Sequence, residues 1–110
     1  MKIVTSLLFL VLAVSLAACG SSAPPAPQTI QLVVTDPPAP PAEVKIPLGA
    51  EVTIVITTPK DDEAHLHGYE VELDVPAGVP TDLTFTANMS GSYELESHIT
   101  EAVWLNLVVS

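Results

Sequence analysis

Period-two alternation of apolar and polar residues dominates the chain from Thr29 onward. The clearest case is Tyr69–Val75, where apolar residues alternate with acidic ones. Successive side chains of a strand point to opposite faces, so this segment predicts a strand with one dry face and one wet face. Other short segments share the pattern and are separated by Pro, Gly, Asp and Asn. No segment of this region shows helical periodicity, so the fold class is predicted to be all-β.

The spacing of these segments predicts how the strands are arranged. We expect strands at Thr29–Thr35, Glu43–Ile46, Glu51–Thr57, Tyr69–Val75, Leu83–Ala87, Ser92–Ser97 and Ala102–Val109. About seven short strands at this spacing predict a β-sandwich.

A different pattern opens the chain. Lys2 precedes an almost unbroken apolar run, Ile3–Leu16, which is typical of a secretory signal peptide and too short for a stable membrane span. The run ends in Leu16-Ala-Ala-Cys19-Gly20, which resembles the lipobox of bacterial lipoproteins. The resemblance implies that the Cys19 sulfur takes a diacylglyceryl group before cleavage. The alternative is that Cys19 is a small buried residue ending a transmembrane helix.

These features predict three parts: a signal peptide at residues 1–18, a lipidated, palmitate-bearing Cys19 with a Pro-rich tether at residues 19–28, and a single domain at residues 29–110. Three acyl chains on one residue would anchor the protein stably in a membrane. We therefore expect an extracytoplasmic, periplasmic-type location. Gly20 stands where an Asp would retain many lipoproteins in the inner membrane, so the outer membrane is expected if the organism has two membranes.

Charge and cysteine content exclude several classes of function. The chain has 13 acidic residues against 3 basic ones, of which Lys2 leaves with the signal. Such an acidic protein is not expected to bind nucleic acid. Cys19 is the only cysteine, so the domain has no disulfide and no cysteine nucleophile. The sequence also lacks a Ser-His-Asp arrangement in a Gly-flanked turn and a phosphate-binding glycine loop, so we do not expect an enzyme.

All three histidines are predicted to lie in loops or at strand ends. His65 and His67 fall in Asp61–Gly68, and His98 follows the strand that ends at Ser97. A His-x-His pair at a strand edge puts both imidazoles on one face, about 7 Å apart at the backbone. Neutral imidazole suits copper and zinc, so His65, His67 and His98 are candidate metal ligands.

Several motifs occur in an order that resembles the cupredoxin-like domains of bacterial lipoproteins. They are Pro37-Pro38, Val44–Gly49, Val52–Thr57, His65-Leu-His-Gly-Tyr69, Asp74–Gly78, Leu83–Thr86 and Gly91-Ser-Tyr-Glu-Leu-Glu-Ser-His98. The resemblance covers residues 29–109. It implies a Greek-key β-sandwich that holds copper at one end.

The copper site implied by this resemblance carries over only in part. His65 or His67 matches the first histidine ligand, but Ser97 stands where the cysteine ligand should fall. Met89 precedes the strand and is a poor axial ligand. Without a thiolate, no blue-copper site is expected. Alternation places His98 on the solvent face beside Glu96.

Two functions remain open. The preferred one is a membrane-anchored module that binds copper, with zinc as the second candidate, and loses metal as the pH falls through about 6.5. The alternative is a metal-free structural or protein-interaction module of an envelope complex, with an unidentified protein partner. Alternation places Trp104 on the opposite face of its strand from Leu105, where it would contact that partner or else pack beneath a loop. A three-histidine site also requires the chain to cross between two sheets rather than form a simple meander.

Overall fold

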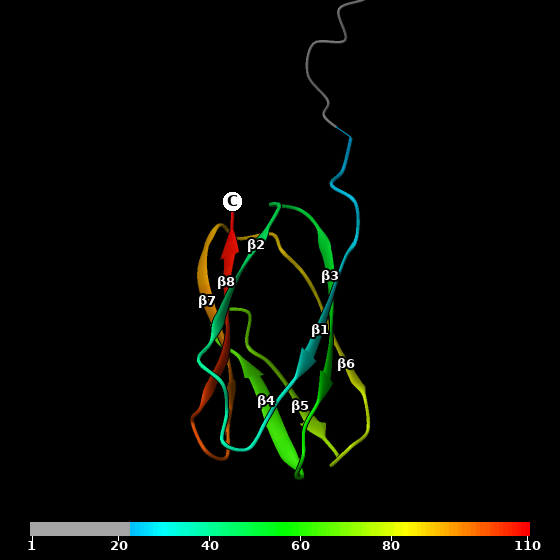
Figure 1. Cartoon of the computed structure of the whole chain (residues 1–110). Helices are drawn as coiled ribbons and strands as arrows, with labels where there is room; N and C mark the ends of the chain where they lie inside the picture. The colour runs from blue at the N-terminus through cyan, green and yellow to red at the C-terminus, as the bar shows by residue number, and fades with distance from the viewer. Residues whose placement is uncertain (1–22) are drawn as a thin grey trace, which may run out of the picture.

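A computed structural model of the chain describes residues 23–110, which form eight strands and no helix (Figure 1). The strands are β1 Gln28–Val33, β2 Ala42–Ile46, β3 Glu51–Thr57, β4 Asp62–Leu66, β5 Val71–Val75, β6 Thr81–Thr86, β7 Gly91–Ser97 and β8 Val103–Val109. The all-β prediction is confirmed. The sequence predicts about seven strands, and the described residues form eight. The additional strand is β4, which lies in a segment for which no strand was predicted.

The strands form two sheets, which confirms the predicted β-sandwich. The smaller sheet has the order β1-β3-β6, and the larger has the order β2-β8-β7-β4-β5. The chain leaves the larger sheet after β5, adds β6 to the smaller one and returns for β7. The crossover arrangement is therefore correct, and the simple meander is wrong. As a consequence, β7 pairs with β4.

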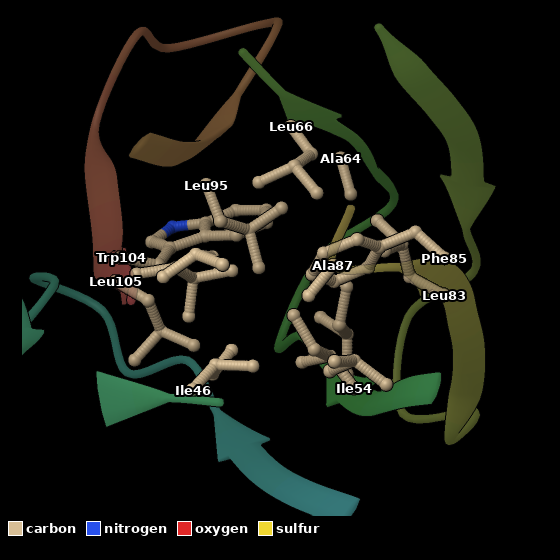
Figure 2. Packing of buried hydrophobic residues seen from close by; sticks show 14 of the residues in the cluster. Ile46, Ile54, Ala64, Leu66, Leu83, Phe85, Ala87, Leu95, Trp104 and Leu105 are labelled. Carbon is tan, nitrogen blue, oxygen red and sulfur yellow. The ribbon is translucent and has the colours of Figure 1, made fainter. Parts of the chain in front are cut away.

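The core lies between the inward faces of the two sheets. Figure 2 shows Ile54, Leu83 and Phe85 of the smaller sheet facing Leu95 and Leu105 of the larger one. The even-numbered apolar residues of β3 are buried as predicted, with Ile54 fully inaccessible. Burial of each such side chain contributes about 1.5–3 kcal/mol to stability.

Trp104 lies in this core and is only 5% exposed. Strict alternation predicted that it would face away from Leu105, but both residues are buried. The reason is an irregularity in the β7–β8 pairing, where Leu95 pairs with Leu105 and Glu96 pairs with Val103. Trp104 is the extra residue between these pairs, and such a bulge re-aims a side chain. Trp104 therefore packs in the core.

Residues 23–27 and the C-terminus lie at the same end of the sandwich (Figure 1). The predicted signal peptide, Cys19 and residues 20–22 of the tether fall outside the described residues. Within residues 23–110, no helix is long and apolar enough to cross a membrane.

Candidate metal centre

His65 lies on β4, between β5 and β7 of the larger sheet, and on the outward face of that sheet. It pairs with Glu72 on β5 and with Glu96 on β7. Its neighbours in sequence, Ala64 and Leu66, are fully buried in the core. Because side chains alternate along a strand, His65 and its two cross-strand glutamates share the opposite face. Of the two predicted places, a loop or a strand end, His65 occupies the second, one residue before the end of β4.

His65 is nevertheless buried, with a side chain only 9% exposed. Surrounding polar side chains cover it, since its ring centroid lies 4.2 Å from that of His67 and 5.6 Å from that of His98. The three predicted ligands thus come together around His65. Their role as metal ligands stays a prediction.

Carboxylates face both ring nitrogens of His65. Nε2 lies 3.3 Å from Glu70 Oε2 and 3.6 Å from Glu72 Oε1. Nδ1 lies 3.7 Å from Glu96 Oε1, is buried and has no hydrogen-bond partner. Buried polar atoms without a partner are rare in native proteins, and such an atom is often satisfied by a bound ion or water molecule.

His67 and His98 are each about half exposed and approach different carboxylates. Nε2 of His67 is hydrogen-bonded to Oε1 of Glu96. Nδ1 of His98 lies 3.9 Å from Oε1 of Glu72. The exposure of His98 agrees with the prediction that it points outward, but the carboxylate that it approaches is that of Glu72 and not that of Glu96.

The turn after β4 positions Glu70. Gly68 and Glu70 both have positive φ angles, of 88° and 53°. A Cβ atom on Gly68 would lie 2.5 Å from Cδ1 of Tyr93, so only glycine fits there. The Gly68 N–H donates a 3.1 Å hydrogen bond to Oε1 of Glu70. The pKa of Glu70 lies below its usual range. The hydrogen bond from the Gly68 amide is the main cause, and the hydrogen bond with the His65 imidazole is the second.

Ser97 stands at the position that a cysteine ligand occupies in the proteins this chain resembles. Here it has a structural role. It is 1% exposed and belongs to the inward-facing residues of β7. Its hydroxyl donates a 2.6 Å hydrogen bond to Asp62 and accepts bonds from the N–H groups of Ile99 and Thr100. These bonds hold the turn that carries His98.

Two groups of residues are arranged so that they could hold a metal ion. The His67 group consists of His65, His67 and Glu70, and the His98 group consists of His65, Glu72 and His98. Within each group the potential ligand atoms lie within 4.8 Å of one another. Imidazole and carboxylate ligands suit Cu(II) and Zn(II). The donor atoms do not fit a blue-copper centre, because residues 23–110 contain no cysteine.

The glutamates of the two groups were not identified from the sequence as candidate ligands. Glu70 and Glu72 were assigned only to the wet face of a strand. Alternation supplied only half of the signal, because the nearness of Glu72 to His65 follows from the pairing of β4 with β5.

The sequence and the fold both resemble those of known proteins. The family model described as the cupredoxin-like domain matches residues 7–109. The chain belongs to the cupredoxin-like domain family. No curated protein matches the chain significantly.

Solved structures with the cupredoxin-like fold resemble this one at low sequence identity. A copper binding protein, determined in its apo form by NMR, is 15% identical with a TM-score of 0.62, over 74% of this chain and 86% of that one. A mutant of amicyanin with Cu(I) is 18% identical with a TM-score of 0.53, over 74% and 82%. The multicopper oxidase Fet3p, which functions in iron import, is 13% identical with a TM-score of 0.61, and the match covers only 23% of its length.

Proposed function

We propose that this cupredoxin-like domain is a binding module for one divalent metal ion, copper first and zinc second, held through His65, His67 and His98. The observation that carries the proposal is His65 itself. This imidazole is buried beneath two other imidazoles, and its Nε2 faces the carboxylates of both candidate groups, Glu70 and Glu72. Carboxylate charge beside the imidazoles favours a divalent cation.

The oxidation state of copper follows from the donor atoms. Thiolate and thioether ligands select Cu(I), whereas nitrogen and oxygen ligands in a tetragonal arrangement suit Cu(II). Both groups around His65 offer two imidazoles and one carboxylate. We therefore propose Cu(II) storage, delivery or sensing rather than blue-copper electron transfer. We propose binding rather than catalysis, because the ligands lie on an outward sheet face and the sequence offers no nucleophile with an activating base.

The proposal is tested by calorimetric titration of the full-length protein with Cu(II) and, separately, with Zn(II). The comparison is a triple variant with His65→Ala, His67→Ala and His98→Ala, which keeps Cys19, so any contribution of the thiol is equal in both proteins. We expect one equivalent of Cu(II) to bind the natural protein at least about 100-fold more tightly, a difference of about 2.7 kcal/mol. Equal affinity would reject the metal site and favour the metal-free interaction module.

We also propose that Cys19 anchors the domain in a membrane through acyl chains. The support is the lipobox-like Leu16–Gly20 segment and the Pro-rich residues that follow it. These residues lead to β1, and the domain's acidic surface would be repelled by anionic headgroups. Cells expressing the protein with labelled palmitate should incorporate label into the natural chain and not into Cys19→Ser. Label in both proteins, or in neither, would reject lipidation at Cys19.

A further inference from the structure

The two candidate groups share one residue, the imidazole of His65. On one side of it are His67 and Glu70, and on the other are His98 and Glu72. This inference rests on the proposed function, that the site binds a divalent ion, and concerns where in the site the ion lies.

The strand pairing explains why the histidines form two groups rather than one. The N–H of His67 donates to the carbonyl of Glu94, whereas the N–H of His98 donates to the carbonyl of Glu63. Glu63 lies two residues before His65, and His67 lies two residues after it. His67 and His98 therefore flank His65 along β4, with backbones about 13 Å apart at 3.3 Å per residue.

The same nitrogen of His65 faces the carboxylates of both groups. Its Nε2 lies 3.3 Å from the Glu70 carboxylate and 3.6 Å from the Glu72 carboxylate. A neutral imidazole offers one lone pair for coordination. The two groups therefore cannot each hold an ion through this nitrogen at the same time.

We propose that one divalent ion alternates between two positions that share His65: an inner-turn position with His67 and Glu70, and a strand-end position with His98 and Glu72. Each position supplies two imidazole nitrogens and one carboxylate oxygen. His67 and Glu70 lie in the turn after β4, and His98 lies in the turn after β7, so ligands on either side can adjust without moving the core. The ion passes between the positions while His65 holds it, which lets it enter from one side and leave from the other.

Three variants of the full-length protein separate the positions. His67→Ala with Glu70→Gln leaves only the strand-end position, and His98→Ala with Glu72→Gln leaves only the inner-turn position. His65→Ala removes both. Each protein is titrated with Cu(II), and its EPR spectrum is recorded at one equivalent.

We expect the natural protein and both double variants to bind one equivalent. Losing one of two comparable positions raises the Kd only by about two- to tenfold, whereas His65→Ala raises it by at least about 100-fold. The two double variants should give different EPR spectra, and a weighted sum of them should reproduce the natural one. The inference is overturned if either double variant binds as weakly as His65→Ala, or if the natural protein binds two equivalents at this cluster. These outcomes differ from failure of the proposed function, in which the natural protein itself binds no better than the triple alanine variant.

Discussion

His65 and Glu96 pair directly across β4 and β7, and the Glu96 carboxylate serves two imidazoles at once. It accepts a hydrogen bond from His67 and lies 3.7 Å from the buried Nδ1 of His65. With a side chain only 16% exposed, Glu96 is the best protected carboxylate of those that face His65. A carboxylate behind ligand histidines fixes ring orientation and increases ligand basicity.

Replacing Glu96 with Gln should therefore weaken metal binding without removing a predicted histidine ligand. We expect the Kd for Cu(II) to rise by about 10- to 100-fold, as is usual when such a supporting group is lost. Calorimetric titration measures the change. Glu94→Gln on the same strand is the control, because Glu94 is exposed and its charge is screened by solvent. Equal effects of the two substitutions would mean that Glu96 acts only through net charge.

Introducing a thiol at Ser97 should not create a blue-copper centre. The Ser97 side chain is buried on the inward side of β7, whereas His65 faces outward. The Ser97→Cys variant should instead lose the hydrogen bond to Asp62, and its free energy of unfolding should fall by about 1–3 kcal/mol.

Urea denaturation measures that loss. Absorption spectroscopy after addition of Cu(II) tests whether a blue-copper centre forms. Ser92→Cys supplies the matched control, since Ser92 is exposed on the same strand and should tolerate a thiol. An intense blue absorption from Ser97→Cys alone would show that position 97 faces the metal, against the prediction.

Gly68 should be far less tolerant of alanine than Gly78, although both have positive φ angles. A Cβ atom on Gly68 meets the Tyr93 ring at 2.5 Å, whereas a Cβ atom on Gly78 has nothing within 4 Å. Both variants share the backbone strain, so the comparison isolates the collision with Tyr93. We expect Gly68→Ala to lower the free energy of unfolding by about 1–3 kcal/mol more than Gly78→Ala. Equal losses in urea denaturation would show that the turn moves freely away from Tyr93.

Glu70 should make the stability of the metal-free protein depend on pH. Hydrogen bonds from Gly68 and His65 keep its pKa in the folded protein below its value in the unfolded chain, which is about 4.3. A lowered pKa stabilises the fold above that value, and this contribution is lost as the pH falls through the lower folded pKa. The natural protein should therefore have a larger free energy of unfolding than the Glu70→Gln variant at pH 7, but not at about pH 3. Urea denaturation at both values measures this, and a gap that persists at low pH would contradict it.

Much of the fold could be predicted because period-two patterns directly report which face of a strand is buried. The segments around Ile54 and Leu107 show this, with strand positions and buried faces as expected. The strand β4 was missed because its sequence, Asp62-Glu-Ala-His-Leu66, has only two apolar residues and three polar ones. Its inward positions hold a small Ala64 and Leu66, and its outward ones hold groups that normally indicate a loop.

The site could be predicted only in part, because its geometry depends on strand pairing that is not local. The histidines were identifiable by residue type, but the place of Glu72 and Glu96 beside His65 follows from the partners of β4 in the sheet. Likewise, Trp104 was placed on the wrong face because a bulge in the pairing of β7 with β8 breaks the alternation. Sequence alternation alone contains neither fact.

The central claim is that His65 binds the metal, and pulsed EPR of the Cu(II)-loaded full-length protein tests it most directly. Electron spin-echo modulation reports the remote nitrogen of an imidazole bound to copper. Each proposed position contains two imidazoles, so we predict modulation from two imidazoles in the natural protein and from at most one in His65→Ala at equal copper loading. Modulation that is unchanged in His65→Ala, or absent from the natural protein, would contradict the claim.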